Sequence, residues 1–261
     1  MTPENGTDDT RSGRSLRAAV QVDVRYARAI ALVAAAALMA AGLSGAQLAV
    51  RWLIIVDDLH VDFRNTGQVR TLLKAIAAGL IRDGDHVALY STGPSSISVE
   101  WTRDRGAVDS VARQIAGNSL KVSDIVAITQ GLTPTDEVGQ RATLALSRVD
   151  EIMASVDPTI DRWIGDRWIG IIFISSGYVD RVPSLPRAGG RARIPIFAID
   201  PRLLPGATVD RAGVNADRWN AYWAATRDSL RALSEQSGGF ALAEGDDLAA
   251  TLARIRDRVI G

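Results

Sequence analysis

The chain has 261 residues, which is enough for one large α/β domain or two small domains. Its 30 basic and 30 acidic side chains give no net charge, so the basic surface of a nucleic-acid-binding protein is not expected. Cysteine is absent, which excludes disulfides, thiolate catalysis and cysteine metal sites.

The N-terminal region has the pattern of a targeting segment. Residues 1–28 form a polar leader of mixed charge, and an apolar run starts at residue 29. Small residues follow this run, so residues 29–46 are predicted to be a secretory signal peptide, cleaved between Ala46 and Gln47. The alternative is a membrane anchor over residues 29–50, since a spanning helix needs about 20 apolar residues. In both cases we expect a hydrophobic N-terminal helix and an exported (periplasmic or extracellular) or membrane-anchored protein.

From residue 51 onward, strand patterns alternate with helix patterns. Strands are predicted at 52–56, 87–91, 97–101, 169–174, 194–199 and 240–243. Helices are predicted at 69–80, 108–115, 135–156, 219–236 and 248–259, the third ending at Asp157-Pro158. Residues 118–134 fit either a short strand or a loop. Apolar strands alternating with helices predict a doubly wound, mainly parallel sheet with helices on both faces.

Polar residues follow three of the predicted strands. They are Asp57 and Asp58 after the first strand, Ser175 and Ser176 after the fourth, and Asp200 after the fifth. Because ligands of such sheets bind outside the carboxyl ends of the strands, we expect these residues to line one ligand-binding edge.

His60 lies close to the acidic pair in the sequence and extends this edge. Asp57, Asp58 and His60 would supply oxygen and nitrogen donors to a metal ion. In the alternative interpretation, Asp57 caps backbone amides and Asp58 is solvated. The sequence leaves both open.

Enzymatic chemistry is not indicated. No glycine-rich phosphate loop follows any strand, and Ser175 lies in no nucleophile elbow. A receiver-like signalling domain, suggested by the acidic pair after the first strand, would need a lysine after the fifth strand. No lysine occurs after Lys121. We therefore expect a protein that is not an enzyme.

Over residues 51–260 the sequence resembles the von Willebrand factor A-like (vWA-like) domains, and among them the bacterial VWFA-related proteins of acidobacterial type. The segments that carry the resemblance, in chain order, are LIIVDDLH (53–60), RDGDHVALYSTG (82–93), WTRDRGAVDSVARQI (101–115), IIFISSGY (171–178), IPIFAIDPRLL (194–204) and LRALSEQSGGFALAEGDDLAATLARI (230–255). The resemblance implies a six-stranded Rossmann-like sheet and a role in binding proteins or ligands.

Domains of this family commonly hold a magnesium ion in an adhesion site at the carboxyl edge of the sheet. The resemblance places Asp57 as the first ligand of this site, with Asp58 beside it. A threonine from a later loop is a further ligand in the family, and here Thr133 or Thr135 would supply it. In the family, hydroxyl residues come two and four places after the first aspartate, but here these positions hold Leu59 and Val61. A second aspartate follows the fourth strand in the family, and here Ser175 and Ser176 lie near that place. The resemblance therefore implies a degenerate adhesion site.

The expected function is that of an exported or membrane-anchored binding module whose partner is a protein or an acidic ligand. No cofactor is fixed by the sequence, and Mg²⁺ or another divalent cation is the candidate. The alternative is a metal-independent structural or assembly domain of the cell envelope. Contact with the membrane is expected only through an uncleaved N-terminal segment.

Overall fold

The computed structural model describes residues 49–131, 135–161, 168–179, 183 and 194–261. The leader 1–28 and the segment 29–46 lie outside these residues, so the N-terminal hydrophobic helix stays a prediction. No helix within the described ranges is both long and apolar enough to cross a membrane.

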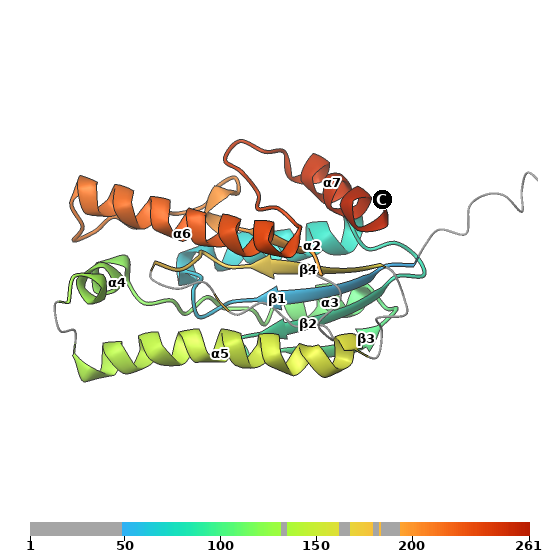
Figure 1. The fold of residues 1–261 in the computed structure, drawn as a ribbon, viewed down its shortest axis with the longest axis horizontal. Coiled ribbons are helices and arrows are strands. Elements are labelled where there is room, and N and C mark those ends of the chain that lie inside the picture. The colour runs from blue at the N-terminus through green and yellow to red at the C-terminus, as the bar shows by residue number, and fades with distance from the viewer. Residues whose placement is uncertain (1–48, 132–134, 162–167, 180–182, 184–193) are drawn as a thin grey trace, which may run out of the picture. The chain divides into compact units, whose positions relative to one another are not determined.

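A five-stranded sheet lies at the centre of residues 49–261 (Figure 1). Its strands are β1 (Arg51–Val56), β2 (His86–Ser91), β3 (Ser98–Thr102), β4 (Ile169–Ile174) and β5 (Ile196–Ile199). They lie in the order β3-β2-β1-β4-β5, and all neighbours are parallel except β2 and β3. The predicted α/β class and mainly parallel sheet are confirmed.

Six α-helices surround the sheet in the described part of the chain. They are α2 (Thr66–Gly79), α3 (Gly106–Ala112), α4 (Val122–Thr129), α5 (Asp136–Asp161), α6 (Ala216–Ser237) and α7 (Leu248–Ile260). Two short 3-10 helices, η1 (Phe63–Asn65) and η2 (Pro201–Leu203), follow β1 and β5.

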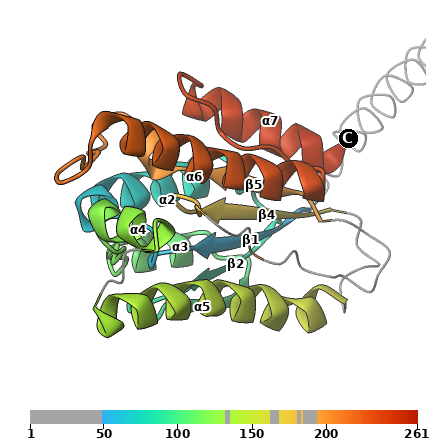
Figure 2. The same cartoon turned by 60° about the vertical axis from the view of Figure 1, so that its left-hand side comes forward.

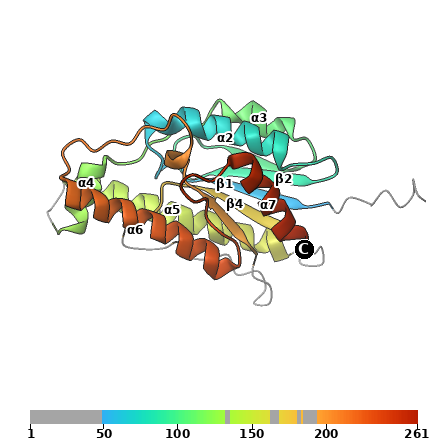
Figure 3. The same cartoon turned by 90° about the horizontal axis from the view of Figure 1, so that it is seen from above.

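Successive side chains of the strands point to opposite faces of the sheet, so the core has two layers, one on each face. In β1, Trp52, Ile54 and Val56 pack with α2, α3 and α7 on one face of the sheet. Leu53 and Ile55 pack with α5 and α6 on the other face (Figure 3). A strand covered on both faces must be apolar at every position, which is why its sequence shows no alternation.

A third, smaller apolar cluster joins α4 to the first half of α6. Its buried members are Val126, Trp219 and Tyr222. Figure 2 shows α4 and the start of α6 side by side, beyond the ends of the strand arrows. These two helices therefore extend the molecule past the carboxyl edge of the sheet.

The prediction of six strands is wrong by one strand. The segment expected at 240–243 forms only an isolated parallel bridge, between Ala198 and Ala241. It makes two backbone hydrogen bonds to β5, at Phe240 and Leu242, before the chain turns away at Gly245. After Leu242 the chain enters a turn at residues 244–245, in which Ala243 N donates to the Asp246 carboxylate, so the pairing with β5 stops there.

Two local predictions are also wrong. Residues 118–134 were expected to be a strand or a loop, but α4 forms within them, since Val126 packs against α6. Helix α5 continues through Pro158 to Asp161. The proline removes one backbone donor in the last turn, and this loss does not end the helix.

The amino edge of the sheet is held by a buried ion pair. Asp85, just before β2, accepts hydrogen bonds from Val50 N (2.8 Å) and Trp52 Nε1 (3.2 Å). Arg256 of α7 donates to it at 2.6 Å, and both side chains are nearly inaccessible to solvent. Burial raises the pKa of the Asp85 carboxyl, but these hydrogen bonds outweigh it and the pKa lies below its usual value.

We expect Arg256→Ala to lower the free energy of unfolding by about 3–5 kcal/mol, because it leaves the Asp85 charge buried without its cation. Urea unfolding followed by circular dichroism measures the loss. The control is Arg258→Ala on the same helix, an exposed arginine with one long hydrogen bond of 3.3 Å to Gly238 O. Equal losses from the two variants would contradict the assignment.

Candidate functional site

The predicted ligand-binding edge forms where β1 and β4 end. Asp57 follows β1, Ser175 follows β4, and the Ser175 hydroxyl donates to Asp57 Oδ2 at 2.8 Å. These two strands are neighbours, with β2 on one side and β5 on the other. The order of the strands reverses between them, which is the position where open α/β sheets bind ligands.

Asp57 is fully buried, and four side chains donate hydrogen bonds to it. Oδ1 accepts from His60 Nδ1 and from Thr92 Oγ1, both at 2.9 Å. Oδ2 accepts from the Ser175 hydroxyl and from the Tyr178 phenol. A carboxylate offers about four lone-pair positions, so this carboxylate is saturated. It has no donor hydrogen of its own, and Nδ1 of His60 therefore carries the hydrogen.

Electrostatics keep this carboxylate charged and the phenol neutral. Burial raises the pKa of the Asp57 carboxyl, but the attraction of His60 and the hydrogen bonds outweigh burial, so the pKa lies below its usual value. Burial and the nearby Asp57 charge both raise the pKa of Tyr178 well above its usual value. The phenol is thus held as a donor to Asp57.

A close backbone approach places Tyr178 at this edge. Gly177 has a φ of +82°, and a Cβ there would lie 2.1 Å from the carbonyl oxygen of Thr226 in α6. Its N–H donates to the Ser175 hydroxyl at 3.1 Å, while Tyr178 N donates to Ser229 Oγ at 2.8 Å. Only glycine fits this turn, where the chain leaves β4 and packs closely against α6.

Asp58 faces the loop that follows β2. Its Oδ2 accepts from Ser95 N (3.1 Å), and its Oδ1 lies 3.2 Å from the Thr92 hydroxyl, which also contacts Asp57. A hydroxyl has one hydrogen, so Thr92 cannot donate fully to both carboxylates. Burial, aided by the Asp57 charge and opposed by hydrogen bonds from the loop, raises the pKa of Asp58. A proton on Asp58 would complete this network.

Asp200 is neutralised by its own neighbour along the chain. Arg202 Nη2 donates to it at 2.7 Å, and Nε lies 3.0 Å from each carboxylate oxygen. The same guanidinium donates to Ser176 O at 2.6 Å and to Thr226 Oγ1 at 3.0 Å. Arg202 therefore joins Asp200 to the end of β4, while the buried Ser176 hydroxyl has no hydrogen-bond partner among the residues that the structure describes.

The residues predicted as metal ligands do not assemble around one point. Thr133 lies outside the described residues, and Thr135 is exposed at the start of α5. All four lone-pair positions of Asp57 are used, and Val61 is buried in the core and has no side-chain oxygen. Among the described residues, no group of three or more His, Asp or Glu side chains is placed to hold a metal ion. This donor set does not fit a magnesium ion.

Three important residues were not singled out from the sequence. Thr92 directly follows a predicted strand, as Ser175 does, and Tyr178 comes four residues after the end of another. Arg202 lies two residues after Asp200, a spacing at which an arginine can fold back onto a carboxylate. Position relative to a strand end could have suggested all three, but the direction of each side chain could not have been read from it.

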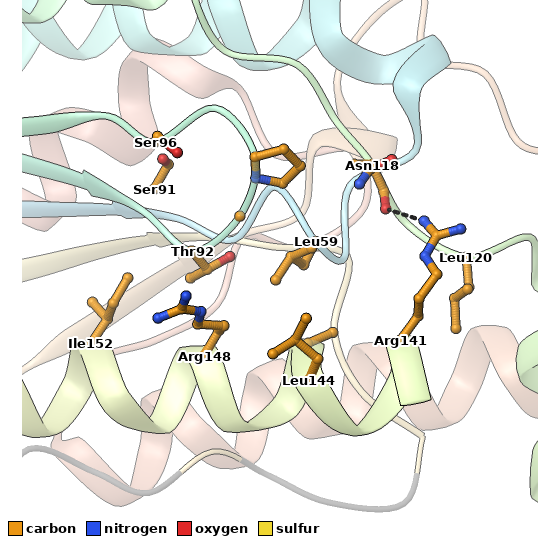
Figure 4. Close-up of a pocket in the computed structure, with 13 residues that line it drawn as sticks. Leu59, Ser91, Thr92, Ser96, Asn118, Leu120, Arg141, Leu144, Arg148 and Ile152 are labelled. Atoms are coloured by element: carbon orange, nitrogen blue, oxygen red, sulfur yellow. Dashed lines mark hydrogen bonds between the residues drawn. The ribbon is translucent and has the colours of Figure 1, made fainter. Parts of the chain in front are cut away.

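Two hollows lie on either side of the loop that follows Asp57. A groove of about 490 Å³ runs between helix α5 and the loops after β2 and α3 (Figure 4). A smaller pocket of about 120 Å³ lies under α4 and is lined by His60, Tyr178 and mostly apolar side chains. Leu59, Leu120 and Ala145 line both, so the two hollows adjoin each other.

We expect Asp57→Asn to lower the free energy of unfolding at pH 7 by about 1–3 kcal/mol for each donor it leaves unsatisfied. The folded-state pKa is lowered, so the charge stabilises the fold above the ordinary value of about 3.9 and this stabilisation is lost as pH falls through the folded-state pKa. The difference from wild type should therefore shrink below about pH 4. Urea unfolding at several pH values measures it.

The adjacent Asp58→Asn variant is the control. Its folded-state pKa is raised, so its charge destabilises the fold as pH rises above about 3.9, and removing the charge should cost little. A loss from Asp58→Asn as large as that from Asp57→Asn would contradict the assignment.

No protein-family model matches the chain, and no curated protein matches it. Among solved structures, the chain is similar to the pilus adhesin SpaC from Lactobacillus rhamnosus GG in an open conformation. The TM-score is 0.39 at 11% sequence identity, with 81% of this chain and 30% of the adhesin covered. The chain thus spans less than a third of the length of that protein.

Proposed function

We propose that this protein is an exported or membrane-anchored vWA-like binding module that binds a protein or an acidic ligand without a metal ion. The observation that carries the proposal is the saturated carboxylate of Asp57 at the point where the strand order reverses. A metal-dependent adhesion site needs free oxygens at this position. Here the same oxygens hold the loops together.

The hollows beside Asp57 support ligand binding over a purely structural role. Concave sites of about 300–1,000 Å³ are typical of ligand-binding pockets, and the groove along α5 is within this range. An assembly domain would need a broad surface instead of a hollow. Location outside the cytoplasm is supported by the sequence pattern of residues 29–46 alone.

If the adhesion site is degenerate, divalent cations should not raise the melting temperature of the protein. A ligand that binds only the folded state at a hundredfold excess over its dissociation constant stabilises it by about 2.7 kcal/mol, and thus raises the melting temperature. We expect no rise with millimolar Mg²⁺, Mn²⁺ or Ca²⁺, measured by thermal unfolding of the full chain against EDTA.

The matched variant is Asp57→Ala, which should melt lower than wild type to the same extent with and without cations. A cation-dependent rise in wild type that this variant abolishes would show a working metal site. The proposal of a metal-independent module would then be wrong.

A further inference from the structure

Among the described residues, the charged side chains that line the groove along α5 are basic. Two of its lining side chains are arginines, Arg141 and Arg148, and among the described residues no aspartate or glutamate lines it. The other lining side chains are uncharged: apolar, small, hydroxyl-bearing or amide-bearing. Charge complementarity therefore favours a negatively charged occupant.

Both guanidinium groups keep donors for a ligand. Arg141 makes one long hydrogen bond, 3.4 Å from Nη2 to the carbonyl oxygen of Asn118 (Figure 4). Arg148 uses Nη1 in a 2.8 Å contact with Glu151, and both side chains of that pair are more than half exposed. Exposed ion pairs of this kind are weak, so a ligand carboxylate can compete for Arg148.

An exposed leucine lies between the two arginines. Leu144 is 54% exposed, whereas the other large apolar side chains among the described residues are buried or half-buried, with Phe63 the exception. Figure 4 shows Arg141, Leu144 and Arg148 rising from α5 toward the loop that carries Leu59. Together they present a charged, apolar and charged surface along one face of the helix.

The spacing on this face selects the geometry of the ligand. Residues 141 and 148 are seven positions apart, so their Cα atoms are about 10.5 Å apart along the helix axis. In a polyproline II segment, residues three positions apart lie on the same side, about 9 Å from each other. Two acidic residues at that spacing match the two arginines. The residues between them point to the flanks of such a segment, and at 3.6 residues per turn Leu144 lies to one side of the line from Arg141 to Arg148, so an apolar residue on that flank can contact it.

We propose that the groove along α5 binds an extended acidic peptide segment of a partner protein, with Arg141 and Arg148 each pairing with one carboxylate and Leu144 contacting an apolar side chain between them. This inference rests on the proposed binding function and names the class of partner. It requires no change in the buried hydrogen bonds of Asp57.

The test uses the full chain and a fluorescein-labelled peptide with the core Glu-Leu-Pro-Glu, followed by fluorescence anisotropy in EDTA. The uncharged peptide Gln-Leu-Pro-Gln is the ligand control. We expect binding of the acidic peptide, about hundredfold weaker binding of the uncharged one because it lacks both charge-assisted pairs, and weaker binding as ionic strength rises.

Arg141→Gln and Arg148→Gln should each weaken binding about tenfold, since each removes a charge-assisted hydrogen bond. Leu144→Ser should also weaken it, and all three positions line the solvent-accessible groove, so the variants are expected to fold. The matched control is Arg231→Gln on α6, which has the same i,i+3 pairing and nearly the same exposure as Arg148. It should bind as wild type.

Three outcomes would overturn the inference. They are no binding of the acidic peptide, equal binding of the two peptides, or unchanged binding by both arginine variants. Failure of the proposed function would differ from these: binding would appear with Mg²⁺ and vanish in EDTA. The two failures are therefore separable in one set of titrations.

Discussion

The buried charge of Asp57 is the constraint on which the carboxyl edge of the sheet depends. A buried carboxylate is tolerated only when hydrogen bonds replace its lost hydration. Here the donors come from the ends of β1, β2 and β4, through His60, Thr92, Ser175 and Tyr178. One side chain thus fixes where three loops leave the sheet. Leu59, two positions after Asp57, is placed between the groove and the smaller pocket as a result.

Two other acidic residues are buried by a related arrangement. Asp85 at the amino edge is paired with Arg256 of α7, and Asp200 at the carboxyl edge is paired with Arg202. Each arginine also bonds a backbone carbonyl, Leu80 O and Ser176 O respectively. The ion pairs therefore tie separate segments together at both edges. Because these arginines are paired inside the protein, the charged side chains that can contact a ligand are the exposed arginines of α5, Arg141 and Arg148.

The sequence predicted most of the fold because long apolar runs have few interpretations. Strand β4 was predicted with its observed bounds, and β1 and β2 within one residue. Short segments were less certain: α4 has only eight residues, and its apolar positions fit a strand equally well. The bridge at Ala241 has strand-like composition, yet whether pairing propagates depends on the turn at Gly245, a tertiary feature.

Which residues lie at the candidate site could be predicted from the sequence, but the hydrogen bonds that their side chains make could not. Sequence placed Asp57 and Ser175 at one edge, and they are hydrogen-bonded there. It could not show whether the Ser175 hydroxyl points to a metal or to the carboxylate, because both uses need the same residue type at the same position. Direction is set by Gly177 and α6, which bring Tyr178 in as a further donor.

Replacing a metal ion by guanidinium groups would change how binding is controlled. A bound cation makes recognition of an acidic ligand depend on the supply of that ion and on open coordination positions. Arginine keeps its charge at all physiological pH values and offers a planar set of donors suited to carboxylates. In the proposed groove, affinity would therefore follow ionic strength and the spacing of Arg141 and Arg148.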